Sequence, residues 1–199
     1  RQNSRTISVI IGNPPYNANQ LNENDNNKNR EYPEVDRRIR ETYIAAGTAQ
    51  KTKLYDMYAR FFRWASDRVA ENDIIAFVNN SSFIDSRTFD GFRKVLTQEF
   101  NEIRIVDLKG NARTSGERRR QEGGNVFDNQ IRVGVAIYFC VKKQGAQGCR
   151  IFYEAVRDYA KADEKREFLQ ATPIWHRRFQ EIRPDPHHNW INLPQNDFD

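Results

Sequence analysis

The 199-residue sequence has no long hydrophobic run. A membrane-spanning helix needs about 20 consecutive apolar residues, and the low mean hydropathy of −0.88 agrees with the lack of such a segment in the sequence. No signal peptide opens the sequence either. We therefore expect a cytoplasmic protein that has no membrane partner.

Cysteine is scarce, and the sequence shows no pattern of metal ligands. Cys140 and Cys149 are the two cysteines, and both lie in apolar, strand-like segments without metal-ligand spacing. We expect free thiols in a reducing compartment. His176, His187 and His188 have no cysteine or carboxylate partner at a suitable spacing. The sequence therefore predicts no metal site.

The sequence also lacks a glycine-rich turn directly after a strand. Gly123 and Gly124 follow a polar loop, and Gly145 and Gly148 belong to an expected hairpin turn. In doubly wound α/β folds, a glycine-rich turn after the first strand commonly binds the cofactor. The part that would bind a cofactor in this way is not found in this sequence.

Charge and length suit one domain with a polyanionic partner. Lysine and arginine number 32 against 27 acidic residues, a net charge of +5. This excess favours a nucleic-acid partner only modestly, because many soluble proteins share it. A chain of this length can bury one sizeable core, so we expect one α/β domain with an appendage.

The most informative motif is Asn13-Pro14-Pro15-Tyr16, directly after the apolar run 7–12. The Asn13 side chain and the Pro14 backbone each offer a carbonyl acceptor, and the two prolines restrict the backbone around them. Two fixed acceptors can hold both hydrogens of a planar amino group and direct its lone pair out of the plane. Tyr16 offers a ring on which an extruded base can stack. This combination favours attack by an adenine amino group on a methyl donor.

The same four residues could form an ordinary turn, because Asn and Pro are common turn formers. The context favours the functional interpretation. The run 7–11 reads as a short buried strand of the parallel type, and the motif falls at its carboxyl end. Open α/β sheets place their ligands at that edge.

The motif resembles the catalytic corner of DNA adenine-N6 methyltransferases that use S-adenosylmethionine. A longer set of residues resembles the methyltransferase region of single-polypeptide Type I-like restriction-modification enzymes, from about Val9 to the end of the chain. These residues are Asn24-Asp25-Asn26-Asn27, Tyr32-Pro33, Asp36-Arg37-Arg38-Ile39, Thr42-Tyr43, Lys53-Leu54-Tyr55-Asp56 and Arg63-Trp64-Ala65-Ser66-Asp67-Arg68.

The resemblance implies a DNA methyltransferase that methylates adenine N6 in duplex DNA by base flipping, with S-adenosylmethionine as cofactor. In enzymes of this type the glycine-rich turn precedes the Asn-Pro-Pro-Tyr corner, and here only twelve residues precede it. We therefore expect a fragment that is inactive alone. Its missing partner is the amino-terminal half of the methyltransferase, together with helicase and nuclease regions of the same polypeptide.

Strand and helix patterns alternate along the chain. They predict helices over 34–46, 53–70 and 88–98, and strands over 73–79, 102–108, 131–142 and 150–156, with a hairpin turn at 144–148. This order resembles the carboxyl-terminal half of a Rossmann-like methyltransferase sheet with a terminal β-hairpin. We expect a partial methyltransferase domain over 1–158. A loop-rich tail over 159–199 is expected to be a linker or the start of a target-recognition region.

Further candidate residues lie downstream of the corner. The segment 109–129 is basic and flexible, which is typical of a phosphate-contacting loop but also of a solvated surface; its candidate DNA contacts are Arg113, Arg118, Arg119 and Arg120. By resemblance, Phe127 corresponds to a second aromatic residue against the flipped base, although core packing is the alternative. By resemblance, Tyr58 falls near the donor's adenine, although its place on an apolar stripe favours the core.

Two other classes of function remain compatible with the motif. An RNA or protein-glutamine methyltransferase could hold a similar planar amino group with the same four residues. A non-catalytic nucleic-acid-binding module could keep the corner as scaffold alone.

Overall fold

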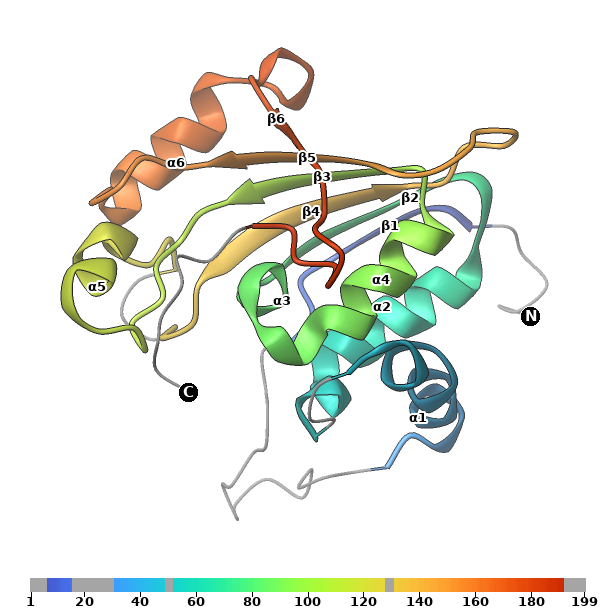
Figure 1. The fold of residues 1–199 in the computed structure, drawn as a ribbon. Coiled ribbons are helices and arrows are strands. Elements are labelled where there is room, and N and C mark those ends of the chain that lie inside the picture. Colours follow the sequence, from blue (N-terminus) through green and yellow to red (C-terminus); the bar gives the residue numbers. More distant parts are fainter. Residues whose placement is uncertain (1–6, 16–30, 49–51, 128–130, 192–199) are drawn as a thin grey trace.

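The computed structural model describes residues 7–15, 31–48, 52–127 and 131–191, which form an α/β fold around one mixed sheet (Figure 1). The expected α/β class is confirmed. Tyr16 and the polar stretch 17–30 lie outside the described residues, so the predictions made for them stay predictions.

The sheet has six strands in the order β1-β2-β4-β3-β5-β6. The four strands β1, β2, β3 and β5 run in one direction, and β4 and β6 run against their neighbours. The strand bounds are Ile7–Gly12 for β1, Val69–Asn80 for β2, Glu102–Asp107 for β3, Val135–Val141 for β4, Arg150–Ala155 for β5 and Gln180–Ile182 for β6.

The expected terminal β-hairpin between the fourth and fifth strands is wrong. β4 and β5 do not pair, because β3 lies between them and bonds to both. Asn101, just before β3, explains the crossing. Its side-chain amide donates to the carbonyls of Ala146 and Gly148 at 3.1 and 3.2 Å, and its Oδ1 accepts from the Lys143 N–H at 2.7 Å. The turn is thus held over the start of β3, and β5 emerges on its far side.

Helices α1 to α4 cover one face of the sheet, and α6 lies on the other (Figure 1). Helix α1 continues through a π-helical turn, η2, and α2 follows a short 3₁₀ turn, η3. The bounds are Pro33–Ile39 for α1, Arg40–Ile44 for η2, Thr52–Tyr55 for η3, Met57–Arg68 for α2, Ser82–Asp85 for α3, Arg87–Phe89 for η4, Asp90–Glu99 for α4, Gly116–Glu122 for α5, Ala162–Ala171 for α6 and Ile174–His176 for η5.

The main core between this helical layer and the sheet is rich in aromatic rings. Phe62 of α2 meets Phe77 of β2, Phe83 of α3 and Phe92 of α4 edge-on, with ring centroids 5.1 to 5.5 Å apart. Along α2, Tyr58, Phe62 and Ala65 are buried, whereas Phe61 is 38% exposed. The backbone is extended at Asp56, with ψ 145°, so the single helix expected over 53–70 is divided into η3 and α2.

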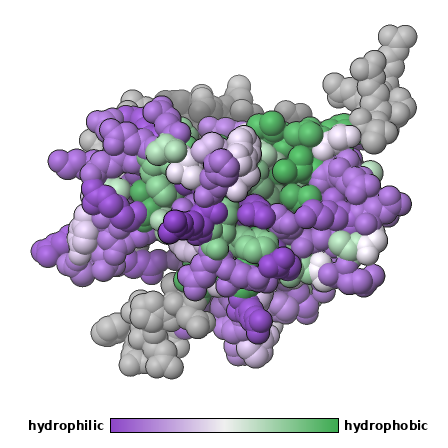
Figure 2. All heavy atoms as spheres, turned by 90° about the horizontal axis from the view of Figure 1, so that it is seen from above, coloured by the Kyte–Doolittle hydropathy of each residue, from purple (hydrophilic) through white to green (hydrophobic). Residues whose placement is uncertain are grey.

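Strand β1 is not the buried strand that its apolar sequence predicted. It pairs with β2 alone and forms one edge of the described sheet. Val9 and Ile11 are 54% and 78% exposed. They share one face of β1 because side chains alternate along a strand. Figure 2 shows the face of the molecule on which α6 lies. Hydrophobic residues are exposed there between hydrophilic ones.

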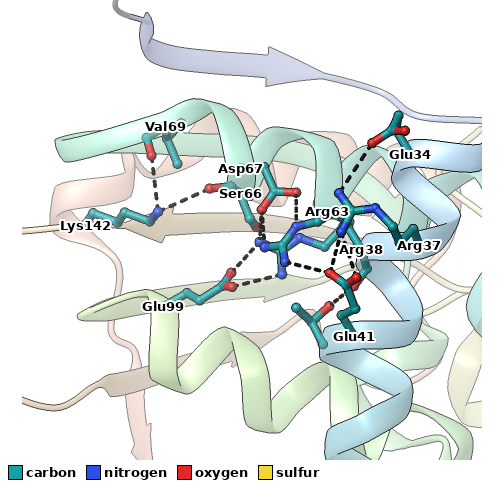
Figure 3. A network of polar contacts seen from close by, with 11 residues as sticks. Glu34, Arg37, Arg38, Glu41, Arg63, Ser66, Asp67, Val69, Glu99 and Lys142 are labelled. Atoms are coloured by element: carbon teal, nitrogen blue, oxygen red, sulfur yellow. Dashed lines mark hydrogen bonds and ion pairs between the residues drawn. The ribbon is translucent and has the colours of Figure 1, made fainter.

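A network of charges joins the helices below the sheet (Figure 3). Arg63 of α2 is 1% exposed and pairs with Glu99 of α4 at 2.9 Å and with Asp67 at 2.8 Å. Asp67 also accepts from Arg38 of α1 at 2.8 Å. Lys142, after β4, donates to the carbonyls of Ser66 and Val69 at the end of α2. These contacts fix α2, whose first residues lie at the edge of the sheet described below.

Candidate active site

The carboxyl ends of β1, β2, β3 and β5 meet at one edge of the sheet, on the side where α5 lies (Figure 1). Antiparallel β4 contributes its amino end there, because Val135 pairs with Asn80, the last residue of β2. Helix α2 leads directly into the start of β2. Its own first residues therefore reach the same edge. We call this the catalytic edge.

The Asn13-Pro14-Pro15 segment leaves the end of β1 at the catalytic edge, as the sequence predicted. Pro14 is buried, and Asn13 and Pro15 are exposed. Burying the middle residue of this corner fixes its backbone against the domain while the side chain of Asn13 remains accessible. The ring of Tyr16 lies outside the described residues.

The end of β2 is shaped by its own asparagines. Asn79 Oδ1 accepts from the Asn80 N–H at 2.8 Å, and Asn80 Oδ1 accepts from the Ser82 N–H at 2.8 Å and its hydroxyl at 2.6 Å. The Ser81 N–H donates to the Gly134 carbonyl at 2.9 Å. A Cβ on Gly134 would lie 2.3 Å from Ser81 Oγ, so a side chain at this position would displace the Ser81 hydroxyl.

Asp56, at the start of α2, belongs to a segment quoted for the resemblance, but the sequence suggested no role for its carboxyl group. The side chain is 6% exposed, and its Oδ1 has no hydrogen-bond partner among the described residues. Burial raises the pKa of this carboxyl to about 7, opposed by the N–H groups of Tyr58 and Met57 and by the charges of Arg60 and Arg113. The influence of Arg113 shows that its charge acts on this part of the edge.

The basic segment between β3 and β4 lies at the catalytic edge, as expected, but most of its cations have protein partners. Arg118 pairs with Asp85 at 2.5 Å, Arg120 pairs with Glu117 at 3.3 Å, and Arg119 donates to the Gly123 carbonyl at 2.9 Å. Lys109 pairs with Asp158. Arg113 is exposed, and no described residue forms an ion pair with it. DNA contact by any of these residues stays a prediction.

Phe127 is not a core residue, because 43% of it is exposed. Its N–H donates to Asn125 Oδ1 at 3.0 Å. Asn125 is buried, and its amide donates to the carbonyls of Gly110 and Val133 at 3.3 and 2.8 Å. Through these hydrogen bonds, Asn125 links the backbone at Gly110, at Val133 and at Phe127. The only sequence signal for this role of Asn125 was its position two residues before Phe127, in a loop that contains glycine.

Tyr58 lies inside the core. It is 2% exposed, and its ring stacks on Phe89 with centroids 5.6 Å apart. This is the packing role that its apolar stripe favoured. Contact with a methyl donor stays a prediction for this residue.

The cysteines are free thiols, as expected. Burial raises the pKa of Cys149 to about 12 and raises that of Cys140 as well, so neither is a ready nucleophile. Within the described ranges, no cluster of three or more His, Cys, Asp or Glu side chains could hold a metal ion. No described helix is both long and apolar enough to cross a bilayer.

A mixed α/β sheet with an Asn-Pro-Pro corner at the carboxyl end of an outer strand is the arrangement expected for a methyltransferase-type domain. The particular family follows from comparison with known proteins. The Eco57I restriction-modification methylase model matches residues 2–113, and the chain belongs to this family. A comparison with curated proteins found no match.

Three solved structures are similar to the chain over almost its whole length. DrdV, solved as a complex with DNA, is 61% identical with a TM-score of 0.90, and 100% of this chain is covered. LlaGI, a Type ISP restriction-modification enzyme, is 40% identical over 98%, with a TM-score of 0.92. LlaBIII, an ATP-dependent Type ISP enzyme bound to DNA, is 36% identical over 99%, with a TM-score of 0.88. The chain spans only 13% to 19% of the length of these proteins.

Proposed function

We propose that this chain is the carboxyl-terminal half of a DNA adenine-N6 methyltransferase domain within a longer restriction-modification polypeptide. The observation that carries the proposal is the position of Asn13 and Pro14 at the carboxyl end of β1, with Pro14 buried and Asn13 exposed. Family membership and the similarity to enzymes solved with DNA support the same assignment.

In this proposal, the target adenine leaves the duplex and enters the catalytic edge. Asn13 Oδ1 and the Pro14 carbonyl accept the two N–H hydrogens of its amino group. The nitrogen becomes more tetrahedral, and its lone pair points out of the ring plane. The prolines and the burial of Pro14 restrict the backbone of the corner, which reduces the ordering that binding requires. Tyr16 and Phe127 stack on the extruded base.

S-adenosylmethionine, when bound, supplies an electrophilic methyl group. The described residues do not form a complete site for such a donor. The sequence has no glycine-rich turn after a strand, and Tyr58 is packed against Phe89 inside the core. We therefore propose that the rest of the polypeptide supplies the remaining donor site, and that this chain binds the donor weakly alone. The exposed Val9 and Ile11 on edge strand β1 suit packing against that part.

The division of the chain at residue 158 also stays a proposal. Within the described residues, β6 belongs to the same sheet as β1 to β5. Trp190, which is 2% exposed, packs in the main core. If the tail leads towards a target-recognition region, it does so after anchoring on the methyltransferase fold.

The decisive test is a methyl-transfer assay of the full-length protein with labelled S-adenosylmethionine and duplex DNA, RNA and protein substrates in parallel. We expect label in DNA, recovered as N6-methyladenine after hydrolysis to nucleosides. Label in RNA or in glutamine side chains would favour the other methyltransferases that the motif allows. Duplex binding without any methyl transfer would favour a non-catalytic module.

A further inference from the structure

The basic segment and the start of the β4 region carry two exposed arginines that remain available to a ligand. Arg113 and Arg132 are both exposed, and neither guanidinium forms an ion pair or hydrogen bond with any described residue. The neighbouring cations differ, because Arg118 and Arg120 pair with carboxylates and Arg119 donates to a backbone carbonyl. A phosphate contact at those residues must compete with an existing partner.

Arg113 and Arg132 come from two segments that lie side by side. The Ala112 N–H donates to the Arg132 carbonyl at 3.0 Å. The Arg113 N–H donates to Asn111 Oδ1 at 3.0 Å, which closes a tight turn at the tip of this segment. The backbone positions of both arginines are therefore fixed next to each other, although they are far apart in the sequence.

Buried polar groups hold the two segments from behind. The Asn125 amide donates to the carbonyls of Gly110 and Val133, one in each segment. On the other side, the Glu122 carbonyl accepts from the Gly110 N–H at 3.1 Å, and Glu122 Oε2 accepts from the Asn111 N–H at 3.0 Å. Such a scaffold reduces the backbone ordering that binding would otherwise require.

The same scaffold connects the arginines to the catalytic edge. Asn125 Oδ1 accepts from the N–H of Phe127, the exposed ring. Gly134, two residues after Arg132, contacts Ser81 at the end of β2. The charge of Arg113 lowers the pKa of Asp56 at the start of α2. Two arginines without a partner among the described residues thus share one scaffold with an exposed aromatic ring, at the edge that carries the Asn13 corner.

We propose that Arg113 and Arg132 form a phosphate clamp for the DNA strand that carries the flipped base, and that Arg118, Arg119 and Arg120 are structural. Phosphodiester groups on either side of an extruded nucleotide suit two adjacent guanidinium groups, because arginine binds phosphate oxygens in a bidentate manner. Phosphate contacts of this kind set register without reading sequence. The inference rests on the proposed function, since it takes DNA as the substrate.

The test measures the salt dependence of duplex binding by the full-length protein and its variants Arg113→Ala, Arg132→Ala and the double variant. Each phosphate contact contributes about 0.9 to the slope of log affinity against log salt concentration. We expect each single variant to reduce the slope by about one and the double variant by about two. Arg113→Lys and Arg132→Lys should keep most of the slope, because lysine retains the charge.

Two arginine variants serve as matched controls. Arg150→Ala removes an exposed arginine at the start of β5, where it pairs with Glu181 at 2.8 Å on the opposite edge of the sheet. Arg120→Ala removes an arginine of the basic segment whose side chain is 77% exposed. Neither should change the slope. Unchanged slopes in the Arg113 and Arg132 variants, or an equal loss in Arg120→Ala, would overturn the clamp.

Methylation of adenine by the same wild-type preparation separates the two proposals. If the wild type methylates DNA and the Arg113 and Arg132 variants keep the wild-type slope, the clamp is wrong and the proposed function stands. If the wild type binds DNA through these arginines but transfers no methyl group, the clamp stands and the methyltransferase assignment fails.

Discussion

Arg93 of α4 donates from Nε to the backbone carbonyl of His188 at 2.7 Å. Its Nη1 donates to the carbonyls of Phe83 and Ser86, each at 2.8 Å, and its Nη2 donates to Asn189 Oδ1 at 3.1 Å. The arginine is fully buried, and all three of its guanidinium nitrogens donate hydrogen bonds. One side chain thereby joins the carboxyl-terminal segment to α3, which directly follows the catalytic edge.

We expect Arg93→Met to destabilise the chain by about 3 kcal/mol or more, because four hydrogen bonds of a buried guanidinium are lost at once. Urea unfolding followed by circular dichroism measures the change. Lys94→Ala, at the next position of the same helix, is the control and should change stability by less than about 0.5 kcal/mol. Equal stability of Arg93→Met and wild type would show that the four hydrogen bonds contribute nothing net.

Asn13→Ala in the full-length protein should reduce methyl transfer by about 100-fold or more, because a fixed acceptor for the amino group is lost. DNA affinity should stay near that of wild type, since Asn13 acts on the reacting nitrogen. Single-turnover methylation and duplex binding are measured in parallel. Asn72→Gly changes an asparagine of β2 with a φ of 65°, near the start of the strand and away from the catalytic edge, and should leave both unaffected. Near-normal turnover of Asn13→Ala would remove this residue from the mechanism.

Asp56 should make stability depend on pH. Its folded pKa of about 7 lies above the unfolded value near 3.9, so the folded chain keeps a proton that the unfolded chain has lost between these values. The stabilisation from this proton is fully present below about pH 4, is lost as pH rises to about 7, and does not change further above that.

Asp56→Asn stays neutral and should therefore become more stable than wild type as pH rises, by at most about 4 kcal/mol at pH 8. Urea unfolding between pH 5 and pH 8 measures the difference. Asp163→Asn changes a carboxylate whose side chain is 87% exposed, and its difference from wild type should not vary with pH in this range. A constant difference for Asp56→Asn as well would mean that Asp56 is ionised throughout.

Glu99→Gln should destabilise the chain by about 1–3 kcal/mol, because it weakens the main partner of buried Arg63. Glu41→Gln is the matched control, since Glu41 is 46% exposed and pairs with Arg37, which is 50% exposed. Exposed pairs contribute little, so the control should lose less than about 1 kcal/mol. Urea unfolding of both variants gives the comparison, and a larger loss in Glu41→Gln would contradict the assigned importance of burial.

The local elements were largely predictable from the sequence. Apolar alternation located β3 and β5, and helical spacing located α2 and α4, because these patterns reflect which side of an element meets the core. The sequence also predicted that the Asn-Pro-Pro corner lies at the carboxyl end of β1, because a proline corner ends a strand. The single helix expected over 53–70 was wrong, because the extended backbone at Asp56 separates η3 from α2.

The pairing of strands and the availability of charges were decided by the tertiary structure. The sequence between β4 and β5 suggested a hairpin, but the side chain of Asn101 holds the turn over β3 and the two strands do not pair. A basic segment likewise looks uniform in sequence. Only the fold shows that Arg118 meets Asp85 while Arg113 stands beside Arg132, because both relationships join residues that are distant along the chain.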